Sequence, residues 1–296
     1  MARTIASIGA TVACIILTAT AATAQAVCSA PHSSPTLAQG GTIATLDPGA
    51  GWVQLSLYAQ NADDRFDSDG FRTPFFAGGE ASTRSAYVTL ALGILEGVDV
   101  WAQAAVHRLR YADQAGVRER TGLGDLRIAT RLGTELIGWH APFTLRAGLK
   151  LPGSRFPVDA TVLPLSEGQT DAELSVETGR AFAGGAVYAL SWVGHRWRFG
   201  RTSTDREPGD EWFAHGGLGG RYRTLRWELA AEALWGQPPT QQGLTLTTDR
   251  RRMLQLSPSF AWAIGPGEAD LGIQAPLVGR NLPSDPGVSL GYRVAW

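Results

Sequence analysis

The stretch LRWELAAEALW, residues 225–235, decides the fold because its side chains change character at every second position. Apolar residues occupy the odd-numbered positions, and one arginine and two glutamates stand between them. A period of two is typical of a β-strand with one apolar and one polar face. Trp227 and Trp235 share the apolar face and lie roughly 26 Å apart along a strand. After tilting, this spacing is about 20 Å across a membrane, close to the apolar band of about 25 Å on outer-membrane barrels.

The same alternation recurs along the chain from Gly51 to Trp296. Its clearest segments are residues 53–60, 87–94, 98–107, 125–132, 143–151, 173–177, 254–264, 271–277 and 288–296. Longer polar segments follow every second strand, at residues 61–84, 112–122, 152–170, 195–210, 236–251 and 279–286. Most of the other connections are tight links. Long loops at one end and short turns at the other are typical of bacterial barrels whose two chain ends face the periplasm.

A secreted soluble β-sandwich also has alternating strands, but three features favour a membrane barrel. Charges stand at mid-strand on the polar faces, tryptophans lie near strand ends, and the chain ends on an aromatic residue. Charged residues make up 18% of the chain, below the roughly 25% of soluble domains. The sequence therefore predicts an all-β fold, a transmembrane antiparallel β-barrel of about 12 strands of the outer-membrane type, over residues 49–296.

The first 26 residues have the features of a secretory signal peptide. Arg3 precedes an apolar run, and Ala24-Gln25-Ala26 offers a cleavage site. We expect residues 27–48 to form a periplasmic tail that is either disordered or a short plug of the lumen. Cys28 is the only cysteine outside the signal, so no internal disulfide is expected. The expected location is the outer membrane of a Gram-negative cell.

Charged side chains on the polar faces are expected to line the lumen. They are Asp99, Arg127, Arg131, Arg146, Lys150, Glu173, Glu177, Arg226, Glu228, Glu232 and Arg293. Four basic residues on two adjacent strands (127, 131, 146 and 150) form a strip that Glu173 and Glu177 neutralise only in part. Two interpretations stay open: a salt-bridged filling that props the barrel open, and a selectivity lining that attracts an anionic or carboxylated aromatic solute.

The sequence shows no catalytic or metal-binding constellation. The histidines beyond the tail lie in four separate segments, at His107, His140, His195 and His215. No serine stands in a recognisable motif beside any of them, so we expect no enzyme. The acidic run at residues 63–70 lacks the distant glutamate of a calcium loop, and neither metal nor cofactor is expected. In the same loop, Phe75 and Phe76 are apolar enough to fold inward as a constriction.

Several short stretches stand in a familiar order: GLGD (122–125), GLKLPG (148–153), GDE (209–211), GRNLP (279–283) and GVSLGYR (287–293). Together they resemble the outer-membrane family named for the meta-cleavage pathway of phenol degradation, over roughly residues 122–296. The resemblance implies a barrel that passes hydrophobic or aromatic compounds, and it supplies no catalytic residue. The final strand also resembles the signal that the barrel-assembly machinery recognises during insertion, carried by Leu290, Tyr292, Val294 and Trp296.

We therefore expect an outer-membrane channel or transporter for small, hydrophobic or aromatic molecules. Its expected partners are membrane lipid, lipopolysaccharide, the assembly machinery and a small-molecule solute. The formal net charge of -1 gives no reason to expect nucleic acid. Two rival classes are a structural or interaction barrel without a conducting path and a lipid-modifying outer-membrane enzyme. Solute flux into liposomes and turnover of purified lipids separate the three.

The first prediction concerns the membrane. Because the apolar faces are expected to contact lipid, the protein should fractionate with the outer membrane. The folded barrel should also migrate differently on a gel before and after heating. Recovery of the protein in the soluble periplasmic fraction would contradict the barrel.

Overall fold

The computed structural model describes residues 44–139, 141–154, 162–200 and 206–296. The predicted signal peptide, the predicted tail up to residue 43 with Cys28, and His140 lie outside the described residues. No helix in the described ranges is long and apolar enough to cross a membrane.

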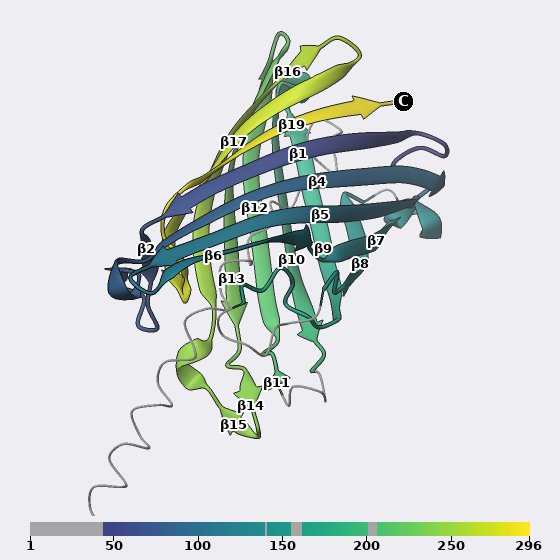
Figure 1. Cartoon of the computed structure of the whole chain (residues 1–296). Helices are drawn as coiled ribbons and strands as arrows, with labels where there is room; N and C mark the ends of the chain where they lie inside the picture. Colours follow the sequence, from purple (N-terminus) through teal and green to yellow (C-terminus); the bar gives the residue numbers. More distant parts are fainter. Residues whose placement is uncertain (1–43, 140, 155–161, 201–205) are drawn as a thin grey trace, which may run out of the picture.

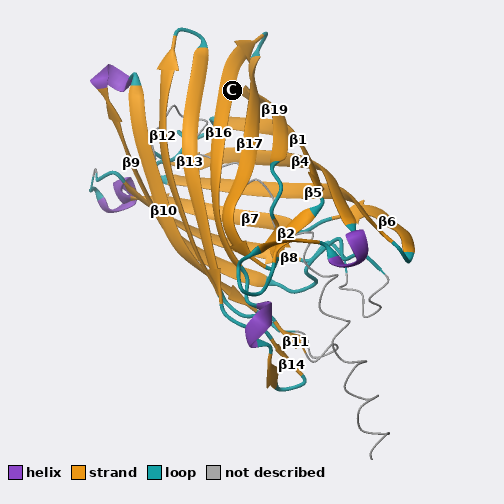
Figure 2. Ribbon diagram, turned by 90° about the vertical axis from the view of Figure 1, so that its left-hand side faces the viewer, coloured by secondary structure: helices purple, strands orange, loops and turns teal. Residues whose placement is uncertain are grey.

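The described chain forms one large antiparallel sheet that closes on itself (Figures 1 and 2). Its strands are β1 (Gly51–Ala62), β4 (Glu80–Leu95), β5 (Val98–Asp113), β6 (Gly116–Leu123), β7 (Leu126–Gly133), β8 (Phe143–Leu151), β9 (Asp171–Phe182), β10 (Val187–Arg198), β12 (Glu211–Tyr222), β13 (Leu225–Gly236), β16 (Arg252–Ile264), β17 (Gly267–Arg280) and β19 (Gly287–Ala295). Consecutive strands pair with each other, and β1 pairs with β19 to close the ring. Strand β7 pairs with the first half of β5 and β6 with its second half, so these two strands share one place in the ring. The barrel therefore has twelve strand positions, as predicted.

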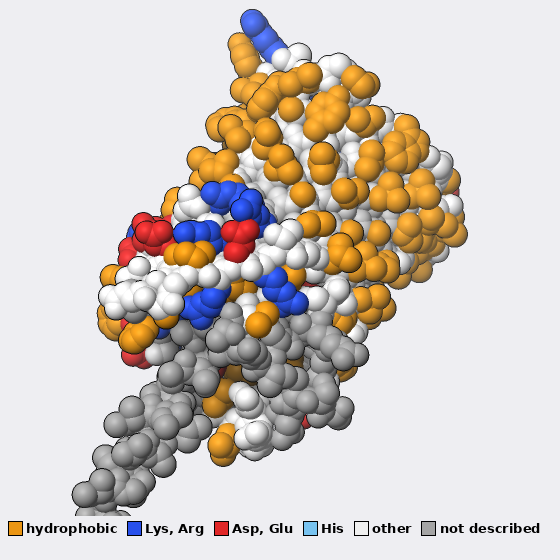
Figure 3. Space-filling model, viewed as in Figure 1, with side chains coloured by type: hydrophobic (Ala, Val, Ile, Leu, Met, Phe, Trp, Pro, Cys, Tyr) orange, Lys and Arg blue, Asp and Glu red, His pale blue; other side chains and the backbone are white. Residues whose placement is uncertain are grey.

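The predicted faces are confirmed on the strands with the clearest alternation. On β1 the side chains of Leu55 and Leu57 are 51% and 50% exposed. Gln54, on the opposite face of the same strand, is buried. On β13 Leu229 points outward and Glu228 is buried. Figure 3 shows the result on one side of the molecule: hydrophobic side chains cover the barrel wall, and charged ones gather near β2 and β6. An apolar outer wall is what a barrel in lipid requires.

Three predicted loops are shorter than expected. β4 already begins at Glu80, β10 continues to Arg198, and residues 112–122 form the hairpin of β5 and β6 and not a loop. The physical reason is that backbone pairing continues beyond the apolar band. There both strand faces meet water, so the side chains no longer alternate and the sequence loses its strand signal.

Short elements decorate the end of the barrel that carries the long connections, called here the loop end. They are β2 (Asp64–Phe66), β3 (Arg72–Pro74), β11 (Arg206–Glu207), β14 (Thr240–Gln241), β15 (Leu244–Thr245) and β18 (Leu282–Pro283), with the 3-10 turns η3 (Phe76–Gly78) and η6 (Thr247–Asp249). The opposite end, the turn end, carries η4 (Thr134–Ile137) and η5 (Ala183–Gly185). Strand β18 pairs with β2, which ties the first and last long connections together.

The chain enters the barrel at the turn end before it becomes β1. Leu46 is buried against Trp52, Ala91 and Trp101, all on the inner face. Its backbone N–H donates to Asp99 Oδ2 at 3.0 Å. Residues 44–48, the described end of the predicted tail, therefore lie against the inner wall.

The second prediction tests the two faces of β13. Leu229 is 49% exposed on the outer wall, so Leu229→Arg should place a charge in lipid and cost roughly 2–4 kcal/mol of folding free energy. Glu228→Gln, on the inner face, should insert normally, because the amide oxygen can still accept the hydrogen bond from Tyr188. Folding of each variant into lipid vesicles is measured by heat-modifiable migration during denaturant titration. Equal stability of both variants would show that the facing is wrong.

Candidate functional site

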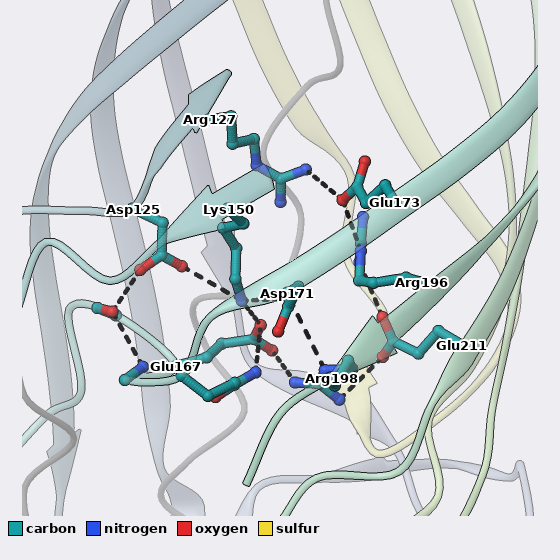
Figure 4. A network of polar contacts seen from close by, with 12 residues as sticks. Asp125, Arg127, Lys150, Glu167, Asp171, Glu173, Arg196, Arg198 and Glu211 are labelled. Carbon is teal, nitrogen blue, oxygen red and sulfur yellow. Dashed lines mark hydrogen bonds and ion pairs between the residues drawn. The ribbon is translucent and has the colours of Figure 1, made fainter. Parts of the chain in front are cut away.

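A network of ion pairs lies on the inner side of strands β7 to β12 at the loop end (Figure 4). It joins five basic and five acidic side chains: Arg127, Lys150, Arg196, Arg198, Arg251, Asp125, Glu167, Asp171, Glu173 and Glu211. Five strands and three connections contribute to it, which brings together residues far apart in sequence. Opposite charges in equal number make this layer neutral, as burial demands.

Glu167 is the centre of this network and comes from the connection between β8 and β9. Its carboxylate lies 2.8 Å from Arg198 Nη2 and 2.7 Å from Arg251 Nη1, and it also contacts Lys150 Nζ. Burial would raise the pKa of Glu167, but Arg198, Arg251 and Lys150 hold that pKa well below its usual range. The carboxylate is therefore ionised at neutral pH and anchors its loop.

The anchored loop, residues 162–170, folds into the barrel. Leu163 and Leu165 are buried against Leu109 of β5. Arg120 of β6 donates to the carbonyl of Leu163 at 2.9 Å, and Ser166 Oγ donates to Asp125. This segment covers the inner wall beside β6, the strand that pairs only with β5 among the described strands.

A second ionic group lies nearer the turn end and is more deeply buried. Arg131 contacts Asp99 Oδ2 at 3.2 Å and Glu177 Oε2 at 3.1 Å, and all three side chains are fully buried. Arg146 Nε lies 3.4 Å from the other oxygen of Glu177. Two positive and two negative charges again cancel. Together with Leu46, this group fills the turn end of the lumen.

All four residues of the predicted basic strip (127, 131, 146 and 150) therefore have acidic partners. The sequence counted only Glu173 and Glu177 as neutralising residues, whereas the structure adds Asp99, Asp125 and Asp171, together with the loop residue Glu167. These contacts are those of a salt-bridged filling. A role of the strip in selecting solute stays a prediction.

The inner wall is hollowed into a cavity of about 120 Å³, and no residue of the two ionic groups lines it. Facing residues on β10, β12, β13 and β16 form rows, and the row at mid-barrel reads Leu190, Gly217, Ala230 and Ser257. Three of these four side chains are small or absent. The rows on either side carry larger groups: Trp192, His215, Glu232 and Gln255 toward the loop end, and Tyr188, Gly219, Glu228 and Ser259 toward the turn end. The small residues in the middle row leave the space.

Predicted lumen residues border this cavity. Glu228 accepts a hydrogen bond from Tyr188 at 2.8 Å, and Glu232 accepts one from Gln255 at 2.8 Å. Arg226 and Arg293 share the carboxylate of Glu268, with an Arg293–Glu268 distance of 2.8 Å. The structure thus divides the predicted set: seven members join the two ionic layers, and the other four line the cavity.

Aromatic residues on the inner face were missed by the sequence analysis. Tyr188, Leu190 and Trp192 form a buried cluster with Phe213, and Trp192 stacks on His215 with ring centroids 3.6 Å apart. The alternation on β10 is weak because both of its faces carry apolar residues. These residues occupy every second position of β10, which is the only trace of their inward direction in the sequence. Because the strand alternates weakly, that direction becomes clear only once the neighbouring strands set the register.

The sequence also missed a serine beside a histidine. Ser85 Oγ and His107 Nδ1 lie 2.7 Å apart on the facing strands β4 and β5. Each residue is only 6% exposed, and neither lines the cavity. The two residues are 22 positions apart in the sequence, so no motif marks the pair and only the register of β4 and β5 brings them together.

Two other predicted groups lie away from the cavity. Phe75 packs edge-on against Tyr111, with ring centroids 5.8 Å apart, and Phe76 is 80% exposed. Their role as a constriction stays a prediction. Among the described connections, residues 162–170 pack against the inner wall. Leu290, Tyr292 and Trp296 point outward from the last strand, and their role in insertion also stays a prediction.

The third prediction concerns Glu177, the acidic centre of the group at the turn end. Glu177→Gln should destabilise the barrel by about 3 kcal/mol, because it removes the charge facing Arg131 and Arg146 in a buried site. The control is Glu119→Gln, whose partner Arg108 is 64% exposed, so that water and salt screen the pair and its loss should change stability little. Both values come from denaturant unfolding in lipid vesicles. Equal losses would show that the buried group adds nothing to stability.

No protein-family model and no curated relative matches the chain. Among solved structures, an outer-membrane channel from Pseudomonas putida F1 is similar with a TM-score of 0.68 and 16% identity, covering 86% of this chain and 97% of that one. The translocator domain of the autotransporter NalP from Neisseria meningitidis has a TM-score of 0.47 and 9% identity over 85% of this chain and 90% of its own. The monoaromatic hydrocarbon channel CymD has a TM-score of 0.43 and 9% identity over 85% and 89%. At this identity the first similarity shows the fold, that of an outer-membrane β-barrel.

Proposed function

We propose that the chain is an outer-membrane channel for small hydrophobic or aromatic compounds. The observation that carries this proposal is the cavity of about 120 Å³ inside a closed barrel with an apolar outer wall. Its lining combines aromatic surface from Tyr87 and Trp192 with polar groups such as Gln274. Binding sites for small molecules typically combine apolar surface with placed polar groups, and this lining is more polar than most because it also carries five charged residues.

The ion-paired network at the loop end bears on how such a channel would open. Residues 162–170 are joined to the wall by the three ion pairs of Glu167, by hydrogen bonds at Leu163 and Ser166, and by the apolar contact of Leu163 and Leu165 with Leu109. A connection between two strands can leave the lumen without breaking any of the backbone pairs that close the barrel. We therefore infer that this loop is the movable obstruction at the loop end.

The ion pairs and the loop of residues 162–170 inside the barrel also support the main alternative, a structural barrel without a conducting path. The lipid-modifying enzyme has less support. A lipid substrate must reach the nucleophile, but Ser85 and His107 are each 6% exposed and face the inside of the barrel. Flux measurements distinguish a channel from a structural barrel.

The fourth prediction is that Glu167→Gln increases flux. Loss of the carboxylate weakens three ion pairs that hold the loop, so uptake of an uncharged aromatic solute should rise about tenfold or more. The measurement uses vesicles with lipopolysaccharide in the outer leaflet, because lipid alone passes such solutes freely. Protein-free vesicles give the background.

Glu119→Gln, at an exposed ion pair of β5 and β6, is the matched control and should leave uptake unchanged. If neither the native protein nor Glu167→Gln exceeds the background, the barrel has no conducting path and the structural alternative holds. If both glutamate variants raise uptake equally, the loop is not the obstruction.

A further inference from the structure

Three arginines gather on the outer surface of β4 and β5 at the loop end, directly beyond the apolar wall. They are Arg84, Arg108 and Arg110, and they are named here the rim cluster. Their positions have the same parity as Val88 of β4 and Val106 of β5, which are 51% and 45% exposed on the outer wall. Figure 3 shows charged side chains gathered at the edge of the hydrophobic wall on this side of the molecule.

The register of the strands shows how far the rim cluster lies from the apolar wall. One outward row across β1, β4, β5 and β6 reads Leu57, Ala86, Val106 and Leu123. The next outward row toward the loop end reads Ala59, Arg84, Arg108 and Thr121. Two residues along a strand rise roughly 7 Å. The arginines therefore begin one row beyond the apolar band, at the height where lipid headgroups meet the acyl chains.

Two members of the cluster repel each other. Arg84 and Arg108 stand directly opposite each other in the β4–β5 ladder, and Arg110 is the next outward residue on β5. Side chains at directly opposite positions begin about 4.5–5.5 Å apart, and like charges there destabilise a sheet. An anion in contact with both guanidinium groups removes this repulsion. An opposed pair of arginines is therefore the arrangement expected where an anion binds.

The chain itself neutralises the rim cluster only in part. Arg108 Nε donates to Glu119 Oε1 at 2.8 Å, and these side chains are 64% and 39% exposed. Arg84 donates instead to two backbone carbonyls and to Asn61 Oδ1, at 2.9–3.0 Å. These contacts fix the guanidinium group, but they leave two of its five N–H donors and its whole positive charge. Across the described ranges neither Arg84 nor Arg110 forms an ion pair with a carboxylate.

The surroundings specify the anion as a phosphate that belongs to a lipid. Guanidinium groups bind phosphate oxygens through two parallel hydrogen bonds, which makes arginine well suited to phosphate. The apolar wall that continues from the cluster, with Val88 and Val106, is suited to acyl chains. Lipopolysaccharide in the outer leaflet combines the two, because its phosphates are attached to the same sugars as its acyl chains. A soluble acidic protein would match the arginines but not the adjoining apolar wall.

We propose that the rim cluster binds the phosphate groups of one lipopolysaccharide molecule, whose acyl chains lie along the outward faces of β4 and β5. Arg84 and Arg108 share one phosphate, and Arg110 adds a third positive charge. The inference goes beyond the proposed function, because it concerns the outer wall and does not depend on a conducting lumen. It requires the loop end to face the outside of the cell, as the loop lengths predict.

The fifth prediction compares two lipids that differ only in phosphate. The purified folded protein in zwitterionic detergent micelles should bind bisphosphorylated lipid A, the lipid part of lipopolysaccharide, about tenfold more tightly than the same lipid without its phosphates. Native mass spectrometry during titration with each lipid gives both affinities. The preference should shrink at high salt, because salt screens charges on an exposed surface.

Variants locate the site. The double variant Arg84→Gln, Arg108→Gln removes the opposed pair and should weaken binding of bisphosphorylated lipid A about tenfold, while the phosphate-free lipid binds as before. The matched control is Arg180→Gln, Arg223→Gln, which removes two exposed arginines at the turn end. This control changes the net charge by the same amount and should alter neither affinity. Heat-modifiable migration verifies that each variant is folded.

Equal affinity of the native protein for the two lipids, or equal losses in the two double variants, would overturn the proposal. Phosphatidylglycerol is the third probe, because it is anionic but carries no phosphorylated sugar. If it binds as tightly as lipid A and is lost in the same double variant, the cluster is a general site for anionic lipid and the assignment to lipopolysaccharide is wrong. Flux is not measured here, so absence of a conducting path would reject the channel and leave this site in place.

Discussion

Closure of the sheet through the β1–β19 pairing is the constraint on which the rest of the structure depends. In hydrocarbon every backbone N–H and C=O must find a partner within the protein, so a sheet can span a membrane only if it has no free edge. Once the ring is closed, each strand has one face in lipid and one in the lumen. The alternation seen at residues 225–235 follows from that division, as do the outward Leu229 and the inward Glu228.

A ring of twelve strand positions encloses an interior of intermediate size. Barrels of about eight strands are filled by their own side chains, and those of 16 or more leave a water-filled channel. In this chain the filling is ionic and arranged in neutral layers. Arg131 illustrates why, because a fully buried guanidinium is tolerated only with Asp99 and Glu177 in contact. The loop residue Glu167 likewise supplies the negative charge that the buried Lys150 and Arg198 require.

The cavity in the inner wall borders a row of small side chains. Gly217, Ala230 and Ser257 face one another across three strands, and none reaches far into the lumen. Pro258 follows directly and has no N–H to give to the ladder, so the wall is also locally less paired. The aromatic pair Trp192 and His215 borders the space from the next row.

The sequence by itself determined the class of fold, the approximate number of strands and the direction of most side chains, because a period of two needs no tertiary information. It also placed eleven charged residues on the inner faces of the strands, but it missed Asp171, Arg196, Arg198 and Glu211. Only the tertiary structure decided their partners: Glu167 reaches Arg198 and Arg251 from a loop, and Asp99 reaches Arg131 across neighbouring strands. It likewise decided that Ser85 meets His107, and that Ala230 and Ser257 share a row with Gly217. Parity along one strand specifies inside or outside, whereas contacts between strands depend on the register, which forms only when the barrel closes.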